Sequence, residues 1–396
     1  MKQPKLRFNA DDGTKFPDWK EKRLNDVCEY NKGQSVGINY VGTENMKQDF
    51  SGVNDLDSEN KVKGVTYNIG DTLMSNIRPY LKKTWKADIK GVCSTDVLVF
   101  HPTNINSDYL YRNISSEKFI SYVMTAAKGS KMPRGDKEHI MNYDIQVPCL
   151  PEQQKIASLF AEIDTLIQSA EKELDGYREL KQGMLQKMFP KKGEKVPEIR
   201  FPEFTGDWEQ HKLGEVAPLR GGYAFKSDKY KTEGTPIVRI SNILSDGSVG
   251  AEFAYYDDIE DDEKCTLGNG DALLAMSGAT TGKVSILKCN NNDKYYQNQR
   301  VGYFERNEQY NYGFVSTIVR SDLFKEQLTL VLVAGAQPNV SSKEIDAFEF
   351  MFPNSIVEQK KIGEYFSNLD NLIALQQQEL DGYKELKKGL LQQMFC

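Results

Sequence analysis

The segments "ELDGYRELKQGMLQKMF" (Glu173–Phe189) and "ELDGYKELKKGLLQQMF" (Glu379–Phe395) are two copies of one sequence within a chain of 396 residues. An ungapped alignment with an offset of 206 extends the match over Glu152–Phe189 and Glu358–Phe395, with 21 identities in 38 positions. Chance does not produce such a match, so the chain contains an internal duplication.

Apolar residues recur within each copy in alternating steps of four and three, the pattern of a coiled-coil seam. The predicted seam residues are Ile156, Phe160, Ile163, Ile167, Leu174 and Tyr177 in the first copy and Ile362, Phe366, Leu369, Ile373, Leu380 and Tyr383 in the second. Polar residues interrupt the seam at Lys181, Gln376 and Lys387. Each copy therefore predicts a long helix, of about 57 Å if all 38 residues are helical.

The sequence does not determine two features of the helices, their continuity and the direction in which they pair. Gly176 and Gly382 lie inside the pattern, and because glycine disfavours helix interiors, the helices can be continuous or bent there. The seam does not specify parallel or antiparallel pairing. Since each helix follows a globular segment of about 150 residues, an antiparallel pair that separates two heads is favoured over helices that fold back onto their own domains.

The two globular segments are diverged copies as well. "PKLRF" (Pro4–Phe8) matches "PEIRF" (Pro197–Phe201), and "NIGDTL" (Asn68–Leu73) matches "GNGDAL" (Gly268–Leu273). Short β-rich runs between Gly and Asn turns predict mixed α/β domains. The expected organisation is a head at 1–150, a helix at 151–192, a second head at 193–353 and a second helix at 354–396, with an internal pseudo-two-fold repeat.

Composition excludes several classes of protein. The net charge is −6, and the second head, residues 197–352, carries 24 acidic against 16 basic residues. The six cysteines are widely spaced without a CxxC pair, which favours reduced thiols over a disulfide or zinc framework. No apolar run is long enough for a membrane span and no signal peptide is evident, so a cytoplasmic location is expected.

No catalytic or metal-binding constellation is recognisable, so no catalytic residue is predicted. The three histidines, His101, His139 and His211, have no partner at ligand spacing. "SGATTGK" (Ser277–Lys283) is one residue short of a phosphate-binding loop, and Val284 replaces the Ser or Thr that holds magnesium. The chain is therefore predicted to bind and not to catalyse.

The order of head, helix, head and helix resembles the specificity subunit of type I restriction-modification enzymes, over the whole chain. The most specific marks are the repeated Glu-Gln-x-Lys-Ile…Phe…Asp-x-Leu-Ile segments at Glu152–Ile167 and Glu358–Ile373. In the second head, Gly221–Ile243 and Asn298–Phe304 are similar to elements of a target recognition domain, whereas the first head matches more loosely.

This resemblance implies that each head reads one half of a bipartite DNA target and that an antiparallel coiled coil sets the unread gap. It also implies two methyltransferase subunits that methylate adenine N6, and motor-nuclease subunits that cut unmodified DNA. S-adenosylmethionine, ATP and magnesium are then expected in those partners and not in this chain. The alternatives are a non-catalytic two-headed protein–protein adaptor, or an enzyme that is either a nuclease or a methyltransferase–specificity fusion.

Loop residues that carry Arg, Lys, Asn, Gln or a hydroxyl group are the candidates for DNA contact. In the first head these are Ser75, Asn76, Arg78, Tyr80, Lys82, Lys83, Lys128, Ser130, Lys131 and Arg134. In the second head they are Arg220, Tyr223, Lys226, Thr280, Thr281, Lys283, Asn298, Gln299, Arg300, Gln337 and Asn339.

Overall fold

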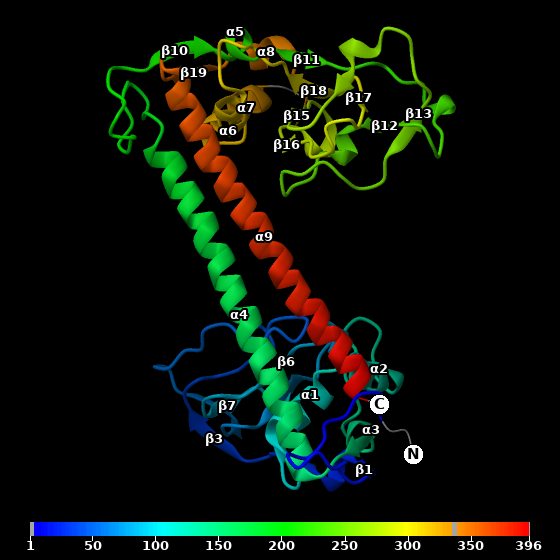
Figure 1. Ribbon diagram of the computed structural model, residues 1–396. Helices are drawn as coiled ribbons and strands as arrows, with labels where there is room; N and C mark the ends of the chain where they lie inside the picture. Colours follow the sequence, from blue (N-terminus) through cyan, green and yellow to red (C-terminus); the bar gives the residue numbers. More distant parts are fainter. Residues whose placement is uncertain (1–3, 335–338, 396) are drawn as a thin grey trace. The chain divides into compact units, whose positions relative to one another are not determined.

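A computed structural model describes residues 4–334 and 339–395 of the chain (Figure 1). The chain divides into two compact units: unit 1 consists of Met1–Glu171 together with Gln378–Cys396, and unit 2 is Lys172–Gln377. Each unit therefore contains one head, part of the helix that follows it, and part of the other long helix. No helix among the described residues is long and apolar enough to cross a membrane.

Unit 1 holds the first head, which is a mixture of short strands and helices. Its strands are β1 (Lys20–Arg23), β2 (Cys28–Tyr30), β3 (Gln34–Gly37), β4 (Val62–Tyr67), β5 (Thr72–Ser75), β6 (Thr84–Lys86), β7 (Gly91–Cys93), β8 (Val97–Pro102) and β9 (Asp144–Val147). Its helices are α1 (Ser107–Ile114), α2 (Glu117–Thr125), α3 (Lys137–Met141) and the start of α4 (Leu150–Lys187).

Unit 2 repeats this plan. Its strands are β10 (Glu209–Lys212), β11 (Leu219–Gly221), β12 (Thr235–Val238), β13 (Ala254–Tyr256), β14 (Thr266–Leu267), β15 (Ala272–Ala275), β16 (Val284–Ile286), β17 (Tyr295–Gln297), β18 (Val301–Phe304) and β19 (Glu349–Phe352). Its helices are α5 (Leu213–Val216), α6 (Tyr312–Val319), α7 (Asp322–Ala334), α8 (Ser342–Asp346) and the start of α9 (Ile356–Met394).

The sheets confirm the internal repeat. A four-stranded antiparallel sheet has the order β2-β8-β5-β6 in the first head and β11-β18-β15-β16 in the second. A two-stranded ribbon closes each head next to its long helix, β1-β9 in one and β10-β19 in the other. The remaining sheet differs, since it has three strands in the first head and four in the second. A common scaffold therefore carries different peripheral strands.

Both long helices remain helical through Gly176 and Gly382, and they run antiparallel to each other within each unit. In unit 1, the last turns of α9 pack on the first turns of α4, where Met394 joins the cluster of Ile156 and Phe160 (Figure 1). In unit 2, the end of α4 packs on the start of α9 through a shared apolar cluster. The helices are thus paired with each other as well as with the heads.

The two polar breaks at lysine are explained by ion pairs across the seam. Lys181 Nζ lies 2.5 Å from a carboxylate oxygen of Asp370 in unit 2. Lys387 Nζ lies 2.7 Å from a carboxylate oxygen of Asp164 in unit 1. Both pairs join α4 to α9, and each of the four side chains is only 21–30% exposed. A polar pair in an apolar seam favours one register, because a slipped helix leaves the lysine without a partner.

The same two aspartates also bind the heads. The second oxygen of Asp164 accepts a hydrogen bond of 2.5 Å from Arg112, at the end of α1. The second oxygen of Asp370 accepts one of 2.5 Å from Arg320, directly after α6. Each aspartate therefore links a head, its own long helix and the opposite long helix.

The Glu-Gln pair at the start of each repeat anchors the head. The Gln153 side chain accepts a hydrogen bond from the backbone N–H of Asn106 (2.8 Å) and donates to Pro148 O (2.8 Å). Gln359 accepts equivalently from the backbone N–H of Asn311 (2.8 Å). Asn106 and Asn311 are the N-caps of α1 and α6. Each long helix thereby fixes the first turn of a helix in the head.

We expect Asp370→Asn to destabilise unit 2 by about 1.5–3 kcal/mol at pH 7, because two charge-assisted hydrogen bonds are weakened. Burial acts to raise the pKa of Asp370, but Arg320 and Lys181 outweigh it and hold the pKa below its ordinary value. A depressed folded-state pKa stabilises the fold above the unfolded pKa of about 3.9 and ceases to do so as the pH falls through the folded pKa.

Urea unfolding of wild type and Asp370→Asn from pH 7 to pH 3.5 measures this effect. The difference between the two proteins should shrink as the pH falls. The control is Glu171→Gln, which breaks an exposed pair with Lys384 and should cost less than about 1 kcal/mol at any pH. A difference that is independent of pH would contradict the role of the charge.

Candidate nucleic-acid interface

In the first head, the structure brings together the two loops that hold the predicted contact residues. Ile77 and Arg134 form a β-bridge. The backbone N–H of Arg78 donates to Pro133 O (2.8 Å), and that of Gly135 donates to Asn76 O (3.4 Å). Residues 75–83 and 127–135 are therefore one surface, although about fifty residues separate them in the sequence.

The backbone of this surface is unusual at two basic residues. Arg78 and Lys82 both have left-handed conformations, with φ of 51° and 56°, on either side of the short 3-10 helix Pro79–Leu81. Such conformations are costly for non-glycine residues and concentrate at binding sites. Among the described residues, the buried Nε of Arg78 and Oδ1 of Asn76 have no hydrogen-bond partner. Both are unpaired polar atoms in the interior of these loops.

The other basic groups of this surface are held by carboxylates or carbonyls. Lys82 contacts Glu117 (2.6 Å) and Asp49 (3.5 Å), and the Lys83 ammonium donates to Thr43 O (2.7 Å). Partners of this kind fix the cation in position.

Lys128 and Arg134 are held in the same way, by Asp136 (2.8 Å) and Asp96 (3.1 Å) respectively. The hydrogen bond from Lys128 helps to lower the pKa of Asp136 to about 2. Ser130 and Lys131 are exposed between them.

Two further candidates for DNA contact in this head, Tyr80 and Ser75, differ in their exposure to solvent. Tyr80 is 47% exposed and presents its ring to solvent. Ser75 is buried, and its hydroxyl donates to Ile77 O (3.0 Å), so it supports the loop from below.

In the second head, four segments that hold the predicted residues meet. Tyr223 and Asn298 form a β-bridge, and the backbone N–H of Gln299 donates to Tyr223 O (2.9 Å). Met276 N–H donates to Arg300 O (3.0 Å). Ser277 and Asn339 form a further bridge, which brings in the segment before α8. Gln337 lies outside the described residues.

Some side chains of this second surface already form ion pairs or hydrogen bonds within the head. Arg220 pairs with Glu305 (3.0 Å), and Lys283 donates to the Ser245 hydroxyl (2.7 Å). The hydroxyl groups of Thr280 and Thr281 donate to backbone carbonyls within the same region. The exposed members are Arg220, Tyr223, Lys226, Gln299, Arg300 and Asn339.

The two surfaces share one backbone frame. Ser75 N–H donates to Lys83 O (3.0 Å) in the first head, and Ala275 N–H donates to Lys283 O (2.9 Å) in the second. Both hydrogen bonds close the loop that follows an equivalent strand, β5 or β15. The same loop thus presents different side chains in the two heads.

The sequence prediction missed one segment of the first head. β2 pairs with β8 as β11 pairs with β18, so the residues after β2, Asn31–Ser35, occupy the position of Arg220–Ala224. Lys32, Gln34 and Ser35 are exposed there. The one available signal is the Asn-Lys-Gly turn after an apolar pair, which does not resemble the Gly-Gly-Tyr-Ala-Phe segment of the second head.

The acidic run Asp257–Glu263 is partly neutralised within its own head. Lys294 contacts both Asp258 and Asp262, and Lys231 contacts Asp257 (2.6 Å). Hydrogen bonds from Lys294 and Tyr296 lower the pKa of Asp262. The run is therefore tied to its own head by cations, and it carries none of the predicted contact residues.

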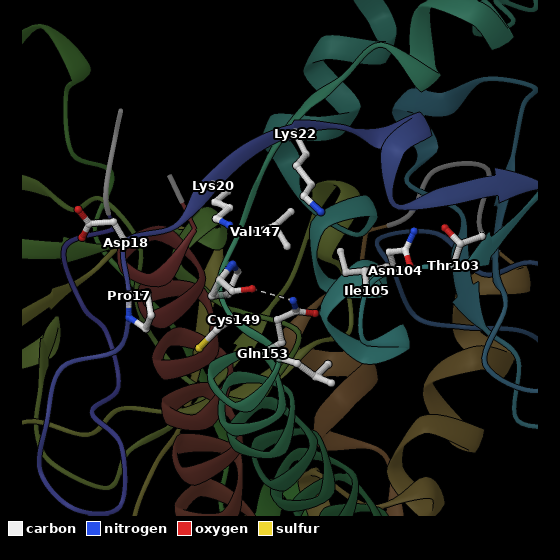
Figure 2. A pocket seen from close by; sticks show the side chains of 12 residues that line it. Pro17, Asp18, Lys20, Lys22, Thr103, Asn104, Ile105, Val147, Cys149 and Gln153 are labelled. Atoms are coloured by element: carbon white, nitrogen blue, oxygen red, sulfur yellow. Dashed lines mark hydrogen bonds between the residues drawn. The ribbon is translucent and has the colours of Figure 1, made fainter.

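A pocket of about 590 Å³ lies in unit 1 at the junction of β1, β9 and the start of α4 (Figure 2). Lys20, Lys22, Cys149 and Gln153 are among its lining residues, and Gln153 donates a hydrogen bond to the backbone carbonyl of Pro148, which also lines the pocket. None of its lining residues belongs to the loops at 75–83 or 127–135. Across residues 4–334 and 339–395, no cluster of three or more His, Cys, Asp or Glu could hold a metal ion.

Comparisons with known proteins give a consistent result. The family described as "Type I restriction modification DNA specificity domain" matches twice, at residues 17–176 and 205–384. The chain is 27% identical to the type I restriction enzyme MjaVIII specificity subunit of Methanocaldococcus jannaschii, over 97% of this chain and 94% of that protein.

Two solved structures share the fold. The S subunit of a type I restriction-modification system from M. genitalium superposes with a TM-score of 0.67 at 13% identity, covering 100% of this chain and 99% of that one. A chain from a study of the assembly and conformational transition of the type I system gives a TM-score of 0.55 at 19% identity, covering 95% and 97%.

Proposed function

The chain belongs to the family of type I restriction-modification DNA specificity proteins, and from this premise we propose that its two heads read the two halves of one bipartite DNA sequence. It is a specificity subunit with two recognition domains, a non-catalytic component of such systems. In the proposed assignment, residues 1–150 and 193–353 are the reading domains, and the helical segments 151–192 and 354–396 set the gap between the half-sites.

The observation that carries this proposal is the shared loop frame with different side chains. The loop after β5 and the loop after β15 close through equivalent backbone hydrogen bonds. The first presents Arg78 and Tyr80, whereas the second presents Thr280 and Thr281. Side chains that reach the groove from a fixed frame are the elements that read base edges. Two heads that differ in these side chains are suited to two different half-site sequences.

In this proposal, partner subunits carry out the methylation and the cleavage of DNA. We propose that two methyltransferase subunits, which hold S-adenosylmethionine, bind this chain and methylate one adenine at N6 in each half-site. Motor-nuclease subunits that use ATP and magnesium join the complex to cut unmodified DNA. The assembly acts in the cytoplasm. This chain supplies the sequence recognition and the spacing.

Single-molecule sequencing of N6-methyladenine tests the function directly. Cells that express this chain together with its methyltransferase subunit should acquire methylation at one bipartite motif, and cells that express the methyltransferase alone should not. A protein–protein adaptor predicts no new motif in either case. An unmethylated genome in cells that contain the assembled complex would therefore overturn the proposal.

A further inference from the structure

The pocket at the junction of β1, β9 and the start of α4 combines cations with apolar surface. Lys20 and Lys22 lie two residues apart on β1, so their side chains leave the strand on the same face. Figure 2 shows both side chains extending from β1 toward the pocket. Ile105 and Val147 also line it and supply apolar surface. One cavity therefore offers two ammonium groups and an apolar wall to the same ligand.

The two ammonium groups are not neutralised by the head. Neither Lys20 nor Lys22 has an ion pair or a side-chain hydrogen bond with the described part of the chain. Glu21, which lies between them in sequence, is on the opposite face of β1. Asp18, the one carboxylate among the described residues that line the pocket, pairs with Arg7 (3.6 Å). Because the cations outnumber the carboxylate, the pocket favours an anion.

The internal repeat shows which residues of the second head correspond to the pocket. The ribbons β1-β9 and β10-β19 pair Lys20 with Val147 and Glu209 with Phe352. Val147 therefore corresponds to Phe352, and Lys22 corresponds to His211. The first head thus has an aliphatic side chain and a cation where the second head has two rings.

A third ring completes this difference. Ile105 and Tyr310 each directly precede the N-cap asparagine of an equivalent helix, α1 or α6. The ring centroid of Tyr310 lies 5.7 Å from that of His211 and 5.6 Å from that of Phe352, in edge-to-face contacts. His211 and Phe352 are also in edge-to-face contact, at 5.8 Å. In the second head, aromatic rings therefore pack together at the position where the first head has a cavity.

The charge differs between the heads as well. Glu209 stands where the first head has Lys20, and its carboxylate accepts a hydrogen bond from the Asn354 side chain (2.9 Å). The second head therefore satisfies its polar groups at this position from within the chain. The first head has unpaired cations beside an open volume, and these are the features of a ligand site.

The pocket's size and its polar rim specify the class of ligand. Its volume of about 590 Å³ is within the range of about 300–1,000 Å³ that is usual for small-molecule sites. Thr103 and Asn104 add a hydroxyl and an amide group, both on exposed residues. Two lysines suit a phosphate group, and the rings at the equivalent position of the second head indicate room for a flat ring. A phosphate joined to a polar-edged ring is a nucleotide.

We propose that this pocket of the first head is a binding site for a nucleoside monophosphate. The phosphate pairs with Lys20 and Lys22. The base lies against Ile105 and Val147, and the hydroxyl and amide groups at the rim bind its polar edge. This site goes beyond the proposed reading of DNA, since none of its residues belongs to the recognition loops. It is specific to the first head, because the second head fills the equivalent position with its own rings.

Calorimetric titration of the full chain with adenosine, guanosine, cytidine and uridine monophosphate tests the site. At least one of them should bind tenfold or more tightly than inorganic phosphate or its own nucleoside, since the phosphate and the base both contribute to binding. Gln153 also lines the pocket and fixes the first turn of α1, so an occupant bridges the head and α4. At 100 times its Kd, the nucleotide should raise Tm by roughly 5–10 °C.

Variants that introduce residues of the second head distinguish the two parts of the site. Lys20→Glu with Lys22→His should weaken nucleotide binding about 100-fold or more, because two charge-assisted hydrogen bonds are lost. Ile105→Tyr should fill the ring position and weaken nucleotide binding about tenfold, while affinity for inorganic phosphate stays within about twofold. Lys63→Ala is the matched control, since Lys63 is an exposed lysine of β4 outside the pocket and should leave binding unchanged.

Other outcomes would overturn the proposal. It is wrong if all four monophosphates bind more weakly than about 1 mM, or if inorganic phosphate binds as tightly as any of them. A 5′-phosphorylated oligonucleotide that binds more tightly than every monophosphate, together with weaker target binding by the assembled complex of Lys20→Ala with Lys22→Ala, would assign the pocket to DNA instead. A failed titration leaves the bipartite methylation motif of wild type in place, so the proposed function is tested separately.

Discussion

Replacing Glu152 by alanine is expected to destabilise unit 1 by about 3–5 kcal/mol, because it removes the acceptor of a buried charge pair. The Glu152 carboxylate is fully buried. It accepts hydrogen bonds from Arg7 (3.1 and 2.8 Å) and from the Trp19 indole (3.0 Å). The pair ties the N-terminal segment of the first head to the start of α4.

The second head provides an internal comparison for this prediction. Glu358 binds Arg200 in the same way (2.7 and 2.9 Å). The equivalent indole nitrogen, Trp208 Nε1, is buried without a hydrogen-bond partner among the described residues. Glu358→Ala should therefore cost less than Glu152→Ala. Urea unfolding measures both, and an unfolding free energy for Glu152→Ala within 1 kcal/mol of wild type would contradict this account of the anchor.

The second large effect is expected at Arg78. Arg78→Ala should lower the affinity of the assembled methyltransferase complex for its target by about 10- to 100-fold, with selectivity lost in one half-site only. Arg78 has a left-handed backbone conformation in the loop after β5, and its buried Nε has no hydrogen-bond partner in the described part of the chain. The guanidinium group of an arginine can form two hydrogen bonds to the edge of one base.

Lys131→Ala is the matched comparison for Arg78→Ala. Lys131 is exposed on the same surface, and as a phosphate contact it should weaken binding equally for all sequences and reduce the salt slope by about one. Competition binding with targets altered in each half-site distinguishes the two residues. Unchanged affinity and selectivity for Arg78→Ala would remove this residue from the interface.

The helices were the most predictable part of the fold. The alternation of four and three residues predicted two long paired helices, since apolar periodicity indicates which face of a helix is buried. The lysines at 181 and 387 interrupted that pattern, and their partners could not be inferred, because Asp164 and Asp370 lie on the opposite helix. A pairing of this kind depends on the antiparallel register, which the periodicity does not contain.

The repeated Glu-Gln pair that begins each long helix was recognisable as a motif, but its hydrogen-bond partners in the head could not be predicted. Glu152 and Gln153 follow an ordinary helix-start pattern, and only the fold shows that they bind Arg7 and the N-cap residue Asn106. The sequence also did not predict which helix ends belong to each unit. In the structure, each head packs on the C-terminal end of the long helix that follows the other head.

The loops were predicted in part. Residues 75–83 and 127–135 were selected by their basic and polar side chains, and the structure brings them together. The segment Asn31–Ser35 was missed because its side chains differ from those of its counterpart, and backbone pairing alone reveals the equivalence. Whether any of these residues contacts DNA stays a prediction.

A chain with two copies of the first head tests the central claim most directly. The anchors permit this exchange, since Gln153 and Gln359 bind the N-cap asparagine of their head with the same geometry. Methylome sequencing of cells that express this chain with the methyltransferase subunit should show an interrupted palindrome, built from one half-site of the wild-type target with an unchanged gap. Methylation that still follows the asymmetric wild-type motif would contradict the claim that each head reads its own half-site.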